Sequence, residues 1–209
     1  MKVLLVNGSP NKNSSTNKSL EIISDKLKEN GIETSIFWIG NKSISGCIGC
    51  GACKKTNKCF IDDKVNEFLK IAKNYDGFIF GSSVHFASPT GFIIPFMDRV
   101  FYGPKKNIFR LKPFASIVCA RRGGSSSSLD VLNKYASFAE MIIVSSNYWN
   151  MVYGSNKDDI VKDLEGVQIL NVLASNMTYI LKLIENGNKN NITKPQLEDK
   201  IYTNFNSKI

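Results

Sequence analysis

No apolar run in the 209-residue chain approaches the roughly 20 residues that a membrane-spanning helix needs, so the sequence predicts no transmembrane segment. The opening stretch, MKVLLVNGSP, reaches Asn7 and Gly8 too early to form the apolar part of a signal peptide. We therefore expect a soluble, cytoplasmic protein that does not bind membranes. Disulfides are disfavoured in that reducing compartment, so clustered cysteines there indicate metal binding or redox chemistry.

Two nucleotide-binding motifs and an internal repeat are also missing. The absence of G-x-x-x-x-G-K-[ST] excludes an NTPase P-loop, and the absence of G-x-G-x-x-G disfavours a Rossmann dinucleotide loop. Acidic residues are few: 18 Asp and Glu against 27 Lys and Arg give a formal charge of +9. That charge raises nucleic acid as a partner. Scattered lysines beside Glu or Asp, as in SLEIISDKLKENG, disfavour it, and the densest basic stretch, residues 103–112, is interpreted as a solvated connection.

Short apolar runs alternate with amphipathic segments along the chain. Runs typical of buried parallel strands occupy residues 2–8, 34–39, 77–83, 114–120 and 141–146. Helical patterns occupy residues 15–31, 62–75, 91–102, 127–140 and 166–186. This order predicts a doubly wound α/β sheet with helices on both faces.

The polar C-terminal stretch suggests a division of the chain. We expect one domain over residues 1–185 and a C-terminal extension over residues 186–209. The extension either packs on a neighbouring subunit through Ile201, Tyr202 and Phe205 or is a frayed tail.

Ligands in such sheets bind beyond the carboxyl ends of the strands, so the loops after the first, third and fourth strands are candidate binding sites. The first loop, NGSPNKNSST, leads directly into a helix whose N–H groups can surround a phosphate. Its contributing residues would be Ser9, Asn11, Ser14, Ser15 and Thr16. A helix N-cap needs only one such residue, so five within eight positions favour phosphate binding.

The other two loops suit a flat ring. His85 and Phe86 are ring residues among small ones after the third strand. Taken alone, His85, the only histidine, is better explained as a capping or surface residue. After the fourth strand, Arg121 and Arg122 offer charge and planar surface, and two glycines that follow permit close backbone approach.

Together, these loops resemble the NADPH-dependent FMN reductase and iron-sulfur flavoprotein group of the flavodoxin-like superfamily. The matching stretches, in order, are GSPNKNSST, GSSVHFASPTGFIIPFMDR, ARRGG and VSSNYWNMVYG. The resemblance implies a flavodoxin-like, five-stranded parallel sheet with strand order 2-1-3-4-5. It also implies FMN at the strand ends, with the phosphate in the loop from Ser9 to Thr16. The ring would then lie against Ser83, Val84, His85, Phe86 and Ala87, with Ala120, Arg121, Arg122, Gly123 and Gly124 close by.

Three positions depart from residues that this family often has: Ser83 replaces Pro, His85 replaces Tyr, and Asn11 replaces a basic residue. The first two should alter ring contacts, and the third weakens phosphate binding unless the arginines or the helix start compensate. Because the family forms dimers or tetramers with flavin near the interface, the resemblance implies a homodimer or homotetramer. Tyr148 and Trp149 would contribute to that interface or to the neighbouring flavin pocket.

Four of the five cysteines, Cys47, Cys50, Cys53 and Cys59, stand within thirteen residues at the spacing C-x2-C-x2-C-x5-C. Four thiolates can ligate a [4Fe–4S] cluster, and three at this tight spacing suit one glycine-rich loop. Iron-sulfur flavoproteins carry a compact cysteine motif in this place. Zinc more often takes two separated cysteine pairs. Free thiols or a disulfide formed in air are further alternatives, and Cys119, in a predicted core strand, is interpreted as packing.

We therefore expect an FMN-dependent oxidoreductase that accepts hydride from NAD(P)H or electrons from a carrier and passes electrons to an acceptor. A cluster, if bound, would relay single electrons, and the basic surface suits an acidic partner such as a ferredoxin. No side chain is assigned as a catalytic acid or base. The alternative is a non-enzymatic flavodoxin-like electron carrier, which the positive charge disfavours because such carriers are typically acidic.

Overall fold

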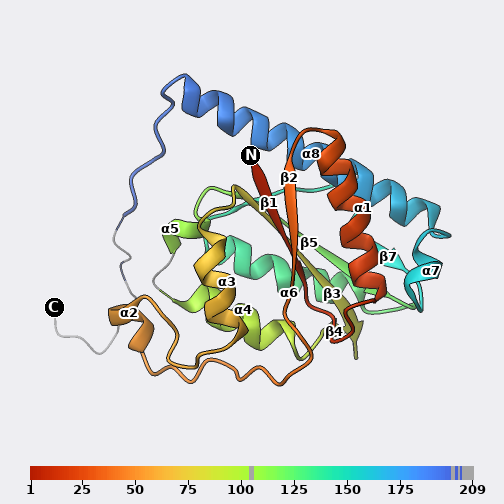
Figure 1. The fold of residues 1–209 in the computed structure, drawn as a ribbon, viewed down its shortest axis with the longest axis horizontal. Coiled ribbons are helices and arrows are strands. Elements are labelled where there is room, and N and C mark those ends of the chain that lie inside the picture. The colour runs from red at the N-terminus through yellow and green to blue at the C-terminus, as the bar shows by residue number, and fades with distance from the viewer. Residues whose placement is uncertain (104–105, 199–200, 202, 204–209) are drawn as a thin grey trace.

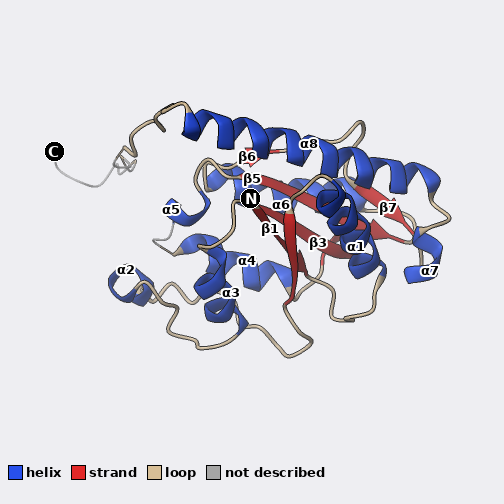
Figure 2. Cartoon of the chain, turned by 45° about the horizontal axis from the view of Figure 1, so that its top comes forward, coloured by secondary structure: helices blue, strands red, loops and turns tan. Residues whose placement is uncertain are grey.

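A computed structural model describes residues 1–103, 106–198, 201 and 203. A twisted sheet runs through its centre with helices on both faces (Figure 1), and its strands stand out in Figure 2. The strands are β1 (Lys2–Asn7), β2 (Glu33–Trp38), β3 (Gly77–His85), β4 (Ser88–Pro89), β5 (Pro113–Ala120), β6 (Ile142–Ile143) and β7 (Met151–Tyr153). The helices are α1 (Ser15–Glu29), α2 (Ala52–Thr56), α3 (Lys64–Ala72), α4 (Ile93–Tyr102), α5 (Lys106–Phe109), α6 (Ser125–Phe138), α7 (Lys157–Ile160) and α8 (Leu164–Lys189).

The sheet has the order β2-β1-β3-β5-β6, and all of these neighbours are parallel. The predicted doubly wound α/β class is confirmed, but the predicted count of five strands is wrong, because the described residues form seven. The additional strand β4 has two residues and lies antiparallel to β3. It shifts the numbering of the strands after it, so the predicted order 2-1-3-4-5 becomes 2-1-3-5-6. The predicted fifth strand, residues 141–146, pairs only at Ile142–Ile143; the chain then leaves the sheet and returns as β7 beside the end of β5.

The core has two layers because side chains alternate along each buried strand. On β1, Val3 and Leu5 point to one face and Leu4 and Val6 to the other, all fully buried. Helices α1 and α8 cover the first face, and helices α3, α4 and α6 cover the second. The paired layers hold the strand ends, and therefore the loops that follow them, in fixed positions.

Helix α8 is, by length and composition, apolar enough to cross a membrane, which the sequence patterns did not predict. One side of the helix, which includes Leu170, Leu173 and Met177, is buried in the core layer, whereas Leu164 and Leu183 are exposed. This is the arrangement of a helix that packs on a sheet. The cellular location stays a prediction.

Helix α8 continues through Lys189, past the predicted domain end at residue 185. The chain beyond it returns to the body of the fold, where the Arg110 guanidinium donates to the carbonyls of Pro195 (2.8 Å) and Gln196 (3.3 Å). Tyr202 and Phe205, predicted to contact a neighbouring subunit, lie outside the described residues. The division into a domain and an extension therefore stays a prediction.

Candidate functional site

The loop between β1 and α1 is held by its own side chains. The Ser9 N–H donates to Asn7 Oδ1 (3.0 Å), the Asn11 N–H to Ser9 Oγ (3.2 Å) and the Asn13 N–H to Asn11 Oδ1 (3.0 Å). Ser14 is the N-cap of α1, where its Oγ accepts from the Asn17 N–H (3.2 Å). Of the five residues predicted to bind phosphate in this loop, Ser14 is therefore the one that caps the helix. The first N–H groups of α1 still have no acceptor within the helix, so the end of the helix can receive an anion.

A cleft of about 510 Å³ lies at the carboxyl ends of the strands, a volume within the usual range of small-molecule sites. It brings together predicted residues from all three loops: Asn11, Ser14, Ser15, Ser83, Val84, His85 and Arg121. It also contains residues that the sequence patterns did not indicate: Asn13, Cys119, Gly154, Ser155, Asn156, Lys157 and Asp158. Residues 154–158 follow β7, a three-residue strand without a clear pattern. The one sequence signal was the family-like stretch that ends at residue 154.

The remaining predicted residues do not line this cleft. Ser9, Thr16 and Ala120 are buried beneath it, where Thr16 Oγ1 is 3.3 Å from Ser83 Oγ. Arg122 and the two glycines after it, Gly123 and Gly124, line a neighbouring pocket of about 340 Å³ together with the exposed rings of Tyr148 and Trp149. The predicted ring-binding residues are therefore divided: Ser83, Val84, His85 and Arg121 line the cleft, Arg122, Gly123 and Gly124 line the neighbouring pocket, and Phe86, Ala87 and Ala120 line neither.

Phe86 and Ala87 form the two-residue turn between β3 and β4. Their φ angles of +51° and +57° lie in the left-handed region, which residues other than glycine rarely adopt. Paired positive φ angles are those of a type I′ hairpin turn. The turn is held against the start of α6, because Ser127 Oγ donates to the Ala87 carbonyl (2.7 Å), and a Cβ at Gly124 would lie 2.5 Å from the Ala87 Cα. Phe86 itself is fully exposed, so it makes no ring contact within this chain's cleft.

Cys119 lies in the floor of the cleft. Its Sγ is 3.3 Å from Ser19 Oγ, and the residue is buried, as expected for a core strand. Burial raises the pKa of the Cys119 thiol to about 11, an effect that hydrogen bonds to Ser19 and Thr16 only partly oppose. The group therefore remains a neutral thiol at physiological pH.

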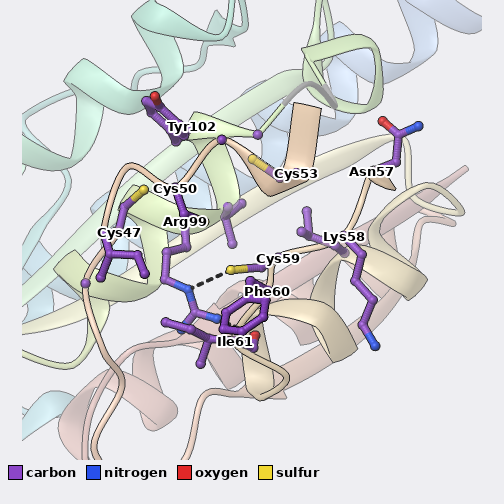
Figure 3. A pocket seen from close by; sticks show the side chains of 16 residues that line it. Cys47, Cys50, Cys53, Asn57, Lys58, Cys59, Phe60, Ile61, Arg99 and Tyr102 are labelled. Carbon is purple, nitrogen blue, oxygen red and sulfur yellow. Dashed lines mark hydrogen bonds between the residues drawn. The ribbon is translucent and has the colours of Figure 1, made fainter. Parts of the chain in front are cut away.

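The four clustered cysteines line a third hollow, a pocket on the α4 side of the sheet (Figure 3). Its loop turns at Gly49 and Gly51, whose φ angles of +67° and +68° favour glycine, and Gly51 directly precedes α2. Apolar side chains complete the walls: Ile48, Phe60, Ile61, Leu69 and Val100.

All five cysteines, each within the described residues, are free thiols. In the same part of the chain, no three Cys, His, Asp or Glu side chains are grouped so that they could hold a metal ion. The predicted ligands Cys47, Cys50, Cys53 and Cys59 thus face one pocket without forming a ready-made metal centre, and the cluster stays a prediction. The donor set still fits a cluster, because four thiols surround one apolar pocket that also contains a cation, Arg99.

Arg99 of α4 was not singled out from the sequence, where it follows Asp98 in a largely apolar helical pattern. Its side chain is 1% exposed and pairs with Asp63, and its Nε donates to Cys59 Sγ (3.3 Å). Burial lowers the pKa of the Arg99 guanidinium, but hydrogen bonds to Asp63 and Cys59 outweigh burial, so the net shift is upward. Arg99 therefore remains charged beside the cysteine loop.

The chain matches the family model of NADPH-dependent FMN reductase over residues 1–156. It is 29% identical over 194 residues to an iron-sulfur flavoprotein of Methanocaldococcus jannaschii, covering 88% of this chain and 100% of that protein. An iron-sulfur flavoprotein of Methanosarcina thermophila is 27% identical over 191 residues, covering 88% and 97%. FerB, an NAD(P)H:acceptor oxidoreductase of Paracoccus denitrificans, shares the fold with a TM-score of 0.66 at 17% identity, covering 87% and 97%. The resemblance inferred from the loops is confirmed: the chain belongs to the NADPH-dependent FMN reductase family.

Proposed function

We propose that this protein binds FMN in the cleft at the strand ends and uses it to carry electrons from NAD(P)H or a reduced carrier to an acceptor. The observation that supports this most directly is the convergence of three polar loops, with the start of α1, on one cleft of suitable volume. When bound, FMN supplies the hydride and electron chemistry, and the protein supplies binding and electrostatics.

The start of α1 and the side chains around it would bind the phosphate. Their N–H groups and the Ser15 hydroxyl offer hydrogen bonds to its oxygens. Asn11 lacks the cation that family members often have there, but Arg121 and Lys157 both line the same cleft. Lys157 belongs to α7, which packs beside α1. We assign to Lys157 and Arg121 the charge that Asn11 does not provide.

The end of β3 would orient the flavin ring. Ser83, Val84 and His85 line the cleft, and the Phe86–Ala87 turn beyond them is held in a strained conformation against α6. A rigid turn at this point would fix the position of the ring edge. Tyr148 and Trp149, exposed beside Arg122, are proposed to contact a second subunit in a homodimer or homotetramer.

The cysteine pocket would hold a [4Fe–4S] cluster through Cys47, Cys50, Cys53 and Cys59, after the loop closes around it. Exposed lysines border the same loop, at positions 54, 55 and 58. A basic rim around an electron-transfer centre suits an acidic electron carrier of the ferredoxin type.

The test is anaerobic purification followed by an absorption spectrum, assays for iron and sulfide, and steady-state oxidation of NADH and NADPH. We expect flavin bands, either as purified or after incubation with FMN, and continuous turnover with an added acceptor. Failure to bind FMN under both conditions would refute the proposal. Flavin without iron would refute the cluster only, and a single stoichiometric electron exchange without turnover would instead indicate an electron carrier.

A further inference from the structure

Arg99 makes an unusually complete set of contacts for a buried cation. Its two terminal nitrogens donate to the Asp63 carboxylate at 2.6 and 2.9 Å, to the Ile61 carbonyl at 2.7 Å and to the Ser45 carbonyl at 3.3 Å. Its Nε donates to Cys59 Sγ at 3.3 Å, the contact drawn in Figure 3. Arginine is almost never fully buried without such partners, so this set explains how the residue is tolerated there.

All of these acceptors belong to one segment, residues 45–63, although Arg99 itself is on α4. Ser45 precedes the first clustered cysteine, Cys59 is the last of them, and Asp63 is the N-cap of α3, where its carboxylate accepts from the Val65 N–H. One guanidinium therefore fastens both ends of the cysteine loop to the same helix. Lysine could not do this, because it lacks the planar fork that reaches several acceptors at once.

We propose that Arg99 is the positioning residue of the cysteine site. It fixes the two ends of the loop and the Cys59 sulfur, and it places a permanent positive charge beside that sulfur. The inference rests on the proposed metal-binding function of the loop. A thiolate-ligated cluster becomes more negative on reduction, so a buried cation that donates to a ligating sulfur favours the reduced state.

Two variants distinguish the anchoring of the two loop ends by Arg99, which we call the clamp, from the effect of its charge. Arg99→Lys keeps the charge but loses the fork, and Arg99→Gln loses the charge. Arg110→Lys is the matched control, since Arg110 is also a mostly buried arginine paired with a carboxylate, Glu140, but does not line the cysteine pocket. Circular dichroism establishes that each variant is folded.

The first measurement is trypsin cleavage of the metal-free protein after the exposed lysines at positions 54, 55 and 58. Both Arg99 variants should be cut in this loop on the order of 10-fold faster than wild type, because the loop opens more readily when its anchor is lost. Arg110→Lys should be cut there at the wild-type rate. Equal loop cleavage in wild type and Arg99→Lys would overturn the clamp, and this arm remains decisive even where Arg99→Gln does not fold.

The second measurement is anaerobic reconstitution with ferrous iron and sulfide, followed by iron content and the reduction potential of the cluster that forms. We expect less iron in both Arg99 variants and a more negative potential in Arg99→Gln, with a smaller shift in Arg99→Lys. A purely structural role would reduce loading but leave the potential unchanged, which would overturn the electrostatic part. If wild-type protein takes up no iron, the proposed metal site is wrong and the electrostatic part falls with it, while the cleavage result still decides the clamp.

Discussion

Replacing Asp63 with Asn would leave the buried Arg99 charge without its carboxylate while changing little else. Asn is close to Asp in shape and caps helices equally well, so the hydrogen bond from the Val65 N–H (3.0 Å) can be kept. The Arg99 side chain is 1% exposed and that of Asp63 is 26% exposed, so the pair is mostly shielded from water. The substitution therefore isolates the ion pair from the helix cap.

Breaking a buried ion pair by removing one partner typically costs about 3–5 kcal/mol, because the remaining charge stays buried. Two backbone carbonyls would still accept from Arg99, and water can reach the partly exposed side of residue 63. We therefore expect a loss at the lower end, about 3 kcal/mol of unfolding free energy. For a chain of this size that corresponds to a fall in Tm of about 6–12 °C.

Urea unfolding followed by circular dichroism, with Tm from calorimetry, measures this loss. Asp62→Asn is the matched control, because Asp62 is the adjacent carboxylate and pairs with Lys58 (3.2 Å) on the exposed surface. Exposed pairs contribute little, so its substitution should scarcely move the midpoint. A loss below about 1 kcal/mol in Asp63→Asn, or equal losses in both variants, would refute the reasoning, since an exposed ion pair can account for a loss of that size.

Three further predictions concern the cleft and its surroundings. Lys157→Gln should weaken FMN binding by roughly 10-fold, as expected for a lost charge-assisted contact. The control Lys182→Gln, on the exposed side of α8, should leave the affinity for FMN unchanged. A fluorescence titration that shows equal affinities for the two variants would contradict this prediction. Because folding raises the pKa of the Cys119 thiol to about 11, its contribution to stability is complete below its ordinary pKa and is lost as the pH rises toward 11. Between pH 8 and pH 11, the unfolding free energy of wild type should therefore fall by roughly 2–3 kcal/mol more than that of Cys119→Ala. The same pH dependence in both proteins would exclude the effect. Ala87→Gly should raise the unfolding free energy by about 0.5–1 kcal/mol, because glycine adopts the left-handed φ of +57° without strain, and a lower midpoint in urea would show that the turn is unstrained.

The predictable parts of the fold are those with a strong local pattern. The strands buried on both faces, such as residues 114–120, are continuous apolar runs, and α1 has both a serine cap and an apolar face. β7 has three residues and pairs with β5 only because the chain returns to the sheet, so no local pattern marks it. Lys157 follows β7, so its contribution to the cleft depends on that return and could not be predicted from a local pattern either.

The cysteine site, too, could be predicted from the sequence only in part. The spacing of the four cysteines identifies the donors, because spacing is a local property of the loop. The cation that holds them comes from α4, 40 residues after Cys59, and its partners become visible only when the two segments are packed together. Arg99 is buried through tertiary hydrogen bonds, which no periodicity in the sequence records.

Helix α4 also joins the two candidate sites. It begins at Ile93, close after Thr90, whose hydroxyl donates to the Gly8 carbonyl (2.8 Å) in the loop proposed to hold the FMN phosphate. Arg99 lies six residues further on, about 9 Å along the helix axis, where it holds the cysteine loop. The residues that line the cleft and those that line the cysteine pocket do not overlap. The two candidate sites are thus separate, and one packed helix connects the segments beside them. If FMN and a cluster bind as proposed, this helix would help to set the spacing between them, on which the rate of electron transfer depends.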